Sequence, residues 1–332
     1  MNRRLAAIAG LCVAGIIGMS ACGSSGQEME GVSDKVQTEA GSVEQESATE
    51  QEVVSTPPES ESVPDEISAE PESEPVVQEE VLRSEESISW DESWEYASYS
   101  KIHSDAVTLY RSDSVDRKDR VVAVNAGHGT SGGESVKTQC HPDGSAKVVS
   151  GSTAAGATEA TAVSSGMVFE DGTKEADANL SLAVLLKEDL LDAGYDVLMI
   201  REGDDVQLDN IARTVFANNN ADYHIALHYD STANDKGAFF IGVPDAGGYR
   251  SMEPVASHWQ EHEALGEALI GGFQEKGLQV FGDGRMAIDM TQTSYSTIPS
   301  VDLEVGDKAS DHSEETQEEI AQAIVLGLDR LQ

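Results

Sequence analysis

Beyond about residue 100, the chain alternates between two spacings of apolar residues. Short runs rich in Val, Ile, Leu and Tyr predict buried strands, and four such runs occupy residues 120–125, 195–200, 223–228 and 301–305. Apolar residues that recur every three or four positions predict amphipathic helices over 179–192, 208–216, about 265–277 and 320–331. Strands that alternate with helices indicate an α/β layered fold. We therefore expect a three-layer sandwich with a central, mostly parallel twisted sheet flanked by helices.

The first 22 residues have the pattern of an export signal. Asn2-Arg3-Arg4 is a basic start, residues 5–19 are apolar, and Ser20-Ala21-Cys22 is a small-residue end. The apolar run is short for a membrane span and has a cleavage-like end. Residues 19–22 resemble a bacterial lipobox, in which the Cys becomes the lipidated first residue. We expect a lipoprotein signal peptide at residues 1–21, lipidation of Cys22, and a protein anchored outside the cytoplasm.

An acidic segment follows the signal. Residues 23–100 consist mainly of Glu, Ser, Val, Gln and Pro, with 22 Asp and Glu against only Lys35 and Arg83. Such a composition cannot bury enough apolar area to offset the conformational entropy of folding. We expect a disordered Glu/Ser/Pro tether at 22–100 and a folded domain at 101–332. The tether could begin to dock at the aromatic residues Trp90, Trp94, Tyr96 and Tyr99.

Charge and cysteine content exclude two classes of function. The chain has 21 Lys and Arg against 61 Asp and Glu, a net charge of -40. Nucleic acid is excluded as a partner because a polyanion requires a basic stripe. Cys12 lies in the signal and Cys22 would carry lipid, so Cys140 alone is left and no internal disulfide is possible. Cys140 has no candidate base with an orienting partner beside it, so we do not expect a cysteine nucleophile.

Four residues with catalytic potential lie near the ends of the predicted strands. His128 follows the first strand, His228 ends the third, Glu304 ends the last, and Glu175 stands just before the helix at 179–192. Function in such sheets lies at the carboxyl ends of the strands. A hydrolytic zinc site needs three protein ligands, an open position for water and a base. Two imidazoles and two carboxylates supply these parts.

The order of these residues resembles the zinc-dependent N-acetylmuramoyl-L-alanine amidases, which cut the amide bond between the glycan and the stem peptide of peptidoglycan. The resemblance covers about residues 120–331. It rests on an ordered set of motifs: Ala126-Gly127-His128-Gly129, Glu175 with Asn179, Arg201 with Asp204 and Asp205, Arg213 with Ala217-Asn218, Leu227-His228, and Leu303-Glu304-Val305-Gly306.

The resemblance implies a Zn²⁺ cofactor held by His128, Glu175 and His228. It also implies that Glu304 is the catalytic carboxylate, which accepts a proton from water and passes it to the leaving amine. The substrate would be peptidoglycan, in the cell wall that the lipid-anchored protein faces. We expect a monomer.

A long insert at about 130–173 separates the first two expected ligands. It is rich in Gly, Ser and Thr and has little apolar mass, which favours an irregular, mobile surface loop over a packed element. Both ends of the insert lie beside the expected site. Long loops in compact domains are usually functional or disordered, so a lid over the site and a decoration without function are both open.

Two other functions fit parts of the sequence. The segment His258-Trp259-Gln260-Glu261-His262 fits the H-x-x-E-H pattern of zinc peptidases, in which both His bind the metal. Tyr229-Asp230 departs from the amidase pattern, which leaves open a non-catalytic, lipid-anchored protein that binds the cell wall. His224 lies four residues before His228, roughly 13 Å along a strand, so we do not expect it in the same site.

Overall fold

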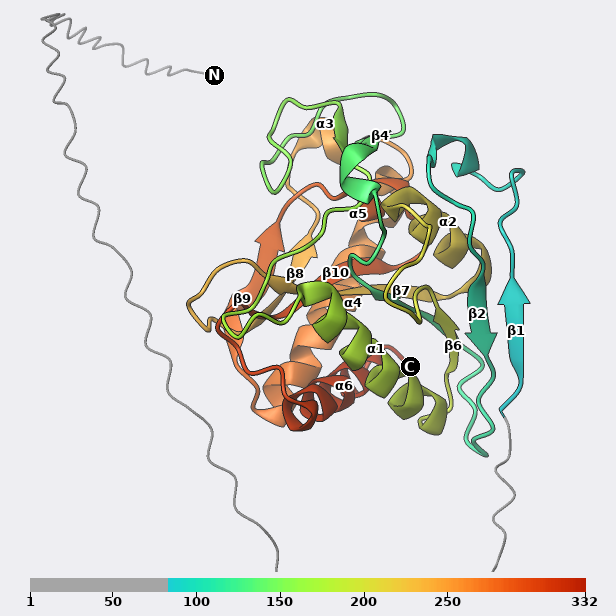
Figure 1. Ribbon diagram of the computed structural model, residues 1–332, viewed down its shortest axis with the longest axis vertical. Coiled ribbons are helices and arrows are strands. Elements are labelled where there is room, and N and C mark those ends of the chain that lie inside the picture. Colours follow the sequence, from blue (N-terminus) through green and yellow to red (C-terminus); the bar gives the residue numbers. More distant parts are fainter. Residues whose placement is uncertain (1–82) are drawn as a thin grey trace, which may run out of the picture. The chain divides into compact units, whose positions relative to one another are not determined.

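The computed structural model describes residues 83–332 (Figure 1). The expected signal peptide, the lipidation site Cys22 and the tether up to residue 82 lie outside the described residues. Within 83–332, no helix has both the length and the apolar composition that crossing a bilayer requires.

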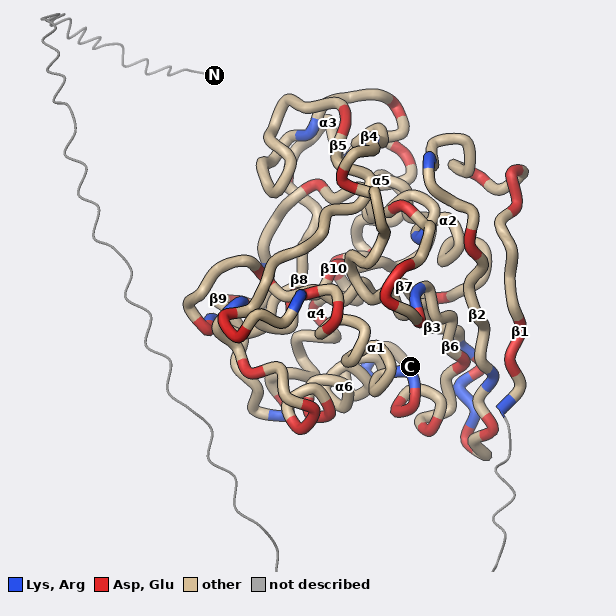
Figure 2. Tube along the Cα trace, viewed as in Figure 1, with Lys and Arg blue, Asp and Glu red and all other residues tan. Residues whose placement is uncertain are grey.

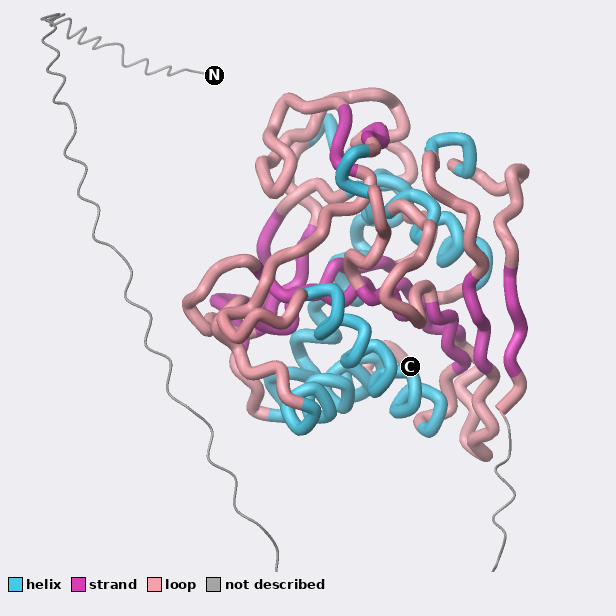
Figure 3. Tube along the Cα trace, in the orientation of Figure 1, coloured by secondary structure: helices cyan, strands magenta, loops and turns pink. Residues whose placement is uncertain are grey.

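A sheet of eight strands forms the centre of the described domain (Figure 3). Its strands are β1 Glu85–Ile88, β2 Val107–Tyr110, β3 Val121–Ala126, β6 Asp196–Met199, β7 Tyr223–Asp230, β8 Ala238–Gly242, β9 Val280–Ala287 and β10 Ser300–Asp307. They lie in the order β1-β2-β6-β3-β7-β10-β8-β9. The central strands β6, β3, β7 and β10 pair in parallel, as do β8 and β9. The pairs β1-β2, β2-β6 and β10-β8 are antiparallel.

Helices cover both faces of this sheet (Figures 1 and 3). They are α1 Glu175–Asp192, α2 Asn210–Asn220, α3 Gly247–Arg250, α4 Val255–Lys276, α5 Thr291–Tyr295 and α6 Glu314–Asp329, with short 3-10 helices η1 Ala97–Tyr99 and η2 Gly133–Ser135. Helices α1, α4 and α6 pack together on one face, and α2 packs with α5 on the other. The predicted three-layer sandwich is confirmed. Its four central strands are the four that the sequence predicts.

Alternating side chains of the central strands divide the interior into two cores. In β3, Val122 and Val124 join the core beneath α1, α4 and α6, whereas Ala123 joins the core beneath α2. The odd-numbered apolar residues of β7 and β10 also belong to the first core. His228 and Glu304 therefore project from the opposite face, the one that α2 and α5 cover.

The folded domain begins before Lys101, which corrects the predicted boundary of the tether. Strand β1 extends the sheet by pairing with β2. Trp90 and Trp94 each pack edge-to-face on Phe216 of α2, with ring centroids 5.4 Å apart. These aromatic contacts give residues 83–100 an apolar anchor despite their acidic composition.

Basic and acidic residues both lie near the amino ends of the central strands (Figure 2), and ion pairs join them. Arg111 and Arg117 bind the buried carboxylate of Asp196 at 2.8 and 2.9 Å. Lys118 lies 2.8 Å from Asp329 of α6. This region therefore presents ion pairs rather than a free basic stripe.

Candidate metal centre

Three of the predicted site residues meet near the carboxyl ends of the central strands. His128 lies in the loop after β3, Glu175 is the first residue of α1, and His228 lies in β7. The Nε2 atom of His128 and the Nδ1 atom of His228 are 3.1 Å apart. The Oε1 atom of Glu175 is 2.8 Å from the first and 3.0 Å from the second. Within residues 83–332, no other group of three or more His, Cys, Asp or Glu could share a metal ion.

The start of α1 differs from the sequence prediction. The helix begins at Glu175 instead of near Asn179, so Glu175 lies within its first turn and not before it. A carboxylate in the first turn is stabilised by the helix dipole. The helix thus fixes the carboxylate and directs it toward the two imidazoles.

The hydrogen bonds of His128 fit the role of a metal ligand. Its Nδ1 atom lies 2.8 Å from the backbone carbonyl oxygen of Ser164. Because a carbonyl only accepts, Nδ1 carries the proton and the lone pair is on Nε2, the atom that faces Glu175 and His228. Metal-binding histidines usually donate their other N–H in this way. Two imidazole nitrogens and one carboxylate oxygen also form a donor set that suits zinc.

Glu175 is an ionised and well-oriented carboxylate. Burial alone would raise its pKa, but the contacts with the His128 and His228 rings outweigh burial and hold the pKa well below the ordinary value. The backbone N–H of Met167 donates to Oε2 at 2.8 Å, and that of Tyr229 donates to Oε1 at 3.2 Å. These contacts place Oε1 between the two imidazoles at neutral pH.

Two buried arginines hold the loop that carries His128. His128 has a left-handed backbone with φ of 65°, which costs a residue with a side chain about 1–2 kcal/mol. Arg213 donates to the carbonyls of His128 at 2.6 Å and Ala126 at 3.0 Å. Arg201 donates to the carbonyls of Ala126 and Gly127, both at 3.1 Å. Burial lowers the pKa of Arg201 to about 10 and of Arg213 to about 9, so both remain cationic at neutral pH.

Two glycines leave room for the clustered side chains of His128, Glu175 and His228. A Cβ atom at Gly127 would lie 2.2 Å from Cε1 of His228. A Cβ at Gly166 would lie 2.7 Å from Cδ2 of His128 and 2.8 Å from Oε2 of Glu175. Gly166 belongs to the insert, so the insert forms one wall of the site. No local sequence pattern distinguishes Gly166 from other loop glycines, so its place beside the candidate ligands becomes visible only in the folded domain.

Strand β10 brings two carboxylates to the same face as His228. Glu304 is the register partner of His228, and Asp302 lies two residues earlier on that face. Burial raises the pKa of Glu304 well above its ordinary value, and the charge of Asp302 raises it further. For His228, burial favours the neutral ring, but Asp302 and Glu175 outweigh it and raise the pKa to about 10. The surroundings of His228 are therefore strongly anionic and favour a cation.

The insert packs against the domain, and the expectation of a loose surface loop is wrong for these residues. It contains a hairpin of β4 Lys137–Gln139 and β5 Glu159–Thr161. The buried carboxylate of Asp289 accepts the backbone N–H of Val148 at 2.7 Å and lies 3.0 Å from Nε2 of His141. Polar contacts of this kind hold the insert, so its low apolar content does not indicate a loose loop.

The histidines of the peptidase alternative do not converge on a third ligand within the described domain. The rings of His258 and His262 have centroids 6.5 Å apart. The Nδ1 atom of His262 accepts the backbone N–H of Ser300 at 3.0 Å, and His258 pairs with Glu261 on the surface of α4. His224 also stays outside the cluster, with its Nδ1 atom 3.2 Å from the Ser300 hydroxyl.

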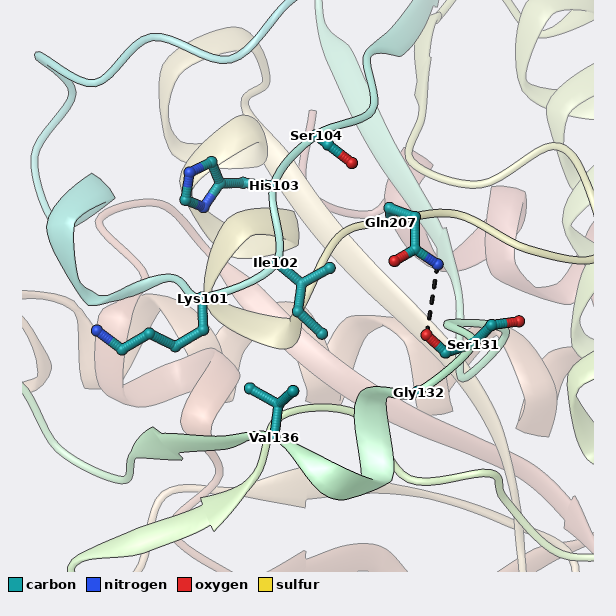
Figure 4. Close-up of a pocket in the computed structure, with 8 residues that line it drawn as sticks. All are labelled: Lys101, Ile102, His103, Ser104, Ser131, Gly132, Val136 and Gln207. Carbon is teal, nitrogen blue, oxygen red and sulfur yellow. Dashed lines mark hydrogen bonds between the residues drawn. The ribbon is translucent and has the colours of Figure 1, made fainter.

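A separate depression lies beside the loop that follows His128 (Figure 4). Its volume of about 460 Å³ falls in the range of small-ligand sites. The side chains of Ile102 and Val136 face one another across it, and Gln207 donates to the carbonyl of Ser131 at 3.4 Å. The eight residues that line it are Lys101, Ile102, His103, Ser104, Ser131, Gly132, Val136 and Gln207. The three clustered ligands are not among them.

A three-layer α/β domain with two imidazoles and a carboxylate converging at the carboxyl ends of its strands has the architecture of a metallohydrolase. Comparison with known families identifies which one. Residues 122–330 match the family model described as N-acetylmuramoyl-L-alanine amidase, and the chain belongs to that family of peptidoglycan-hydrolysing enzymes.

Solved structures share the fold. The apo form of the N-acetylmuramyl-L-alanine amidase Ami1 from Mycobacterium abscessus is 19% identical, with a TM-score of 0.51 over 64% of this chain and 98% of that chain. Ami1 from Mycobacterium smegmatis is 16% identical, with a TM-score of 0.51 over 64% of this chain and 96% of that chain. No curated protein matches the sequence significantly.

Proposed function

We propose that this enzyme hydrolyses the amide bond between N-acetylmuramic acid and L-alanine with a zinc ion held by His128, Glu175 and His228. The observation that carries the proposal is the convergence of one donor atom from each residue within 4.8 Å. The hydrogen bond from His128 Nδ1 to Ser164 supports it, since it leaves Nε2 free to bind a metal. The family membership specifies the amide bond that is cut.

A zinc ion in this site would supply Lewis acidity, which polarises the scissile carbonyl and acidifies water. Glu304 is the proposed general base. It accepts the proton of the attacking water and passes it to the nitrogen of the leaving L-alanyl peptide. The products are a lactyl carboxylate on the glycan and a peptide with a free amino terminus.

The position of Glu304 supports this role. It neighbours His228 across the β7-β10 pair, on the same face of the sheet. Its Oε2 atom is buried and has no hydrogen-bond partner in the described domain, so no contact within the fold occupies the lone pairs of this oxygen. Burial raises its pKa, which brings its proton affinity closer to that required of a base at neutral pH.

Separate substitutions test the two roles. Replacing His128, Glu175 or His228 with Ala should abolish stoichiometric zinc binding by residues 83–332. Glu304→Gln should retain zinc and lower the rate of amide cleavage by about 10²- to 10⁴-fold, measured by mass spectrometry of digested peptidoglycan. Near-normal turnover by Glu304→Gln would contradict its role as base. Replacing both His258 and His262 with Gln is the control and should leave zinc content unchanged.

We also propose that the enzyme acts outside the cytoplasm as a lipid-anchored monomer. Its signal peptide would end at residue 21, Cys22 would carry the lipid, and the acidic tether would reach to about residue 82. The family's substrate, cell-wall peptidoglycan, supports this location. Cys22→Ser should release the protein from membranes and remove lipid incorporation, with size-exclusion chromatography reporting the oligomeric state. Firm membrane retention of a processed Cys22→Ser protein would contradict the anchor.

A further inference from the structure

Each ring nitrogen of His228 faces a different group. Nδ1 points into the ligand cluster, 3.1 Å from His128 Nε2 and 3.0 Å from Glu175 Oε1. Nε2 points away from the cluster and lies 3.9 Å from Oδ2 of Asp302. No other ion pair involves Asp302 in the described domain.

The strand register places Asp302 at this position. Asp302 pairs with Ala226 of β7, and Glu304 pairs with His228. Because residues two apart on a strand project from the same face, Asp302 and His228 share the α2 face of the sheet. β10 is an interior strand with β7 and β8 on its two sides, so its backbone holds this geometry firmly.

Asp302 is buried without the partners that a buried carboxylate requires. Its side chain is 7% exposed, and its Oδ1 atom has no hydrogen-bond partner among residues 83–332. A buried carboxylate without hydrogen-bond partners destabilises a fold strongly. We therefore expect Asp302 to act on a neighbouring group, and its one ion-pair partner in the described domain is the His228 ring.

The two imidazoles of the cluster follow the same rule. His128 directs Nε2 into the cluster and donates Nδ1–H to the Ser164 carbonyl. His228 directs Nδ1 into the cluster and turns Nε2 toward Asp302. In metal sites, a carboxylate partner behind a ligating histidine fixes its tautomer and makes the ligating nitrogen more basic. With Glu175, Asp302 places a second carboxylate beside the His228 ring.

We propose that Asp302 is a positioning residue whose carboxylate, 3.9 Å from His228 Nε2, favours the proton on that nitrogen and thereby leaves Nδ1 as the metal-binding atom. This inference rests on the proposed zinc site. It assigns a role in metal binding that is distinct from proton transfer by Glu304.

Zinc affinity, measured by chelator competition on residues 83–332, tests the inference independently of activity. Asp302→Ala should weaken zinc binding by about 10- to 100-fold. Asp302→Asn keeps an acceptor oxygen without the charge and should fall between Asp302→Ala and wild type. The matched control is Asp196→Asn, which removes another buried carboxylate but one bound to Arg111 and Arg117. Its zinc affinity should equal that of wild type.

Imidazole ¹⁵N NMR of the zinc-loaded wild-type protein needs no substitution and covers the case in which a variant fails to fold. The spectrum should show His228 with Nε2 protonated and Nδ1 bound to metal. Metal on Nε2, or zinc affinities within twofold of wild type in both Asp302 variants, would overturn the inference alone. Failure of the wild-type protein to bind zinc would overturn the proposed function and this inference together.

Discussion

The insert forms a wall of the proposed metal site, and substitution of Gly166 tests how tightly that wall fits. Gly166 has φ of 82°, and an added Cβ would contact His128 and Glu175 at 2.7–2.8 Å. The left-handed backbone alone costs Ala about 1–2 kcal/mol. Overpacking of this kind adds about 1–3 kcal/mol, so Gly166→Ala should lose about 2–5 kcal/mol in total. If 1.4 kcal/mol of the packing conflict appears at the ligands, zinc affinity falls tenfold.

Gly172 provides the matched control. It lies in the same insert with φ of 93°, and an added Cβ would meet no atom within 4 Å. Gly172→Ala therefore has the backbone strain without the clash, and should lower thermal stability while zinc affinity stays within twofold of wild type. The assay is chelator competition on residues 83–332, combined with thermal unfolding of the zinc-free protein. Equal zinc affinities in the two variants would refute the view that the insert shapes the site.

Three further predictions concern the rest of the domain. Burial lowers the pKa of His262 from 6.5 to about 3. Between these pH values, the His262 side chain is protonated in the unfolded chain and neutral in the folded protein. The free energy of unfolding should therefore fall as the pH drops from about 6.5 toward 3, by about 1.4 kcal/mol per pH unit for this group. His262→Gln should make this pH dependence less steep, as measured by denaturant titrations at several pH values. The same pH dependence in the variant and the wild type would contradict the prediction. Trp90→Ala and Trp94→Ala should each lower the free energy of unfolding by about 2–3 kcal/mol, measured by chemical denaturation. This loss is smaller than for a fully buried Trp because both side chains are partly exposed. Losses below about 0.5 kcal/mol would show that residues 83–100 add little to the stability of the fold. Replacing residues 134–168 with a short Gly/Ser linker removes the hydrogen bonds from His128 to the Ser164 carbonyl and from the Met167 N–H to Glu175. Zinc binding should therefore weaken. Unchanged zinc affinity would show that the insert is not needed for metal binding.

The pattern of apolar residues along the chain is enough to predict the architecture, and the order of the motifs is enough to predict the candidate ligands. The four central strands are short apolar runs with both faces buried, so their composition alone marks them. The helices carry their apolar residues at helical spacing because each packs one face against the sheet. His128, Glu175, His228 and Glu304 were found because the ordered motifs resemble a family, and the carboxyl ends of parallel strands bring such residues together.

The contacts that hold the candidate site form only when distant parts of the chain pack together. The roles of Arg201 and Arg213 depend on carbonyls in a loop distant in sequence, and no local pattern reveals such contacts. The composition of residues 83–100 and of the insert does not predict that they pack, because only a few contacts hold each segment. Trp90 and Trp94 pack on Phe216, and Asp289 accepts a hydrogen bond from the insert backbone. In the sequence, nothing distinguishes Asp302 from other acidic residues on strands. Its position behind His228 follows from the β7-β10 register, which is fixed only when the strands pair.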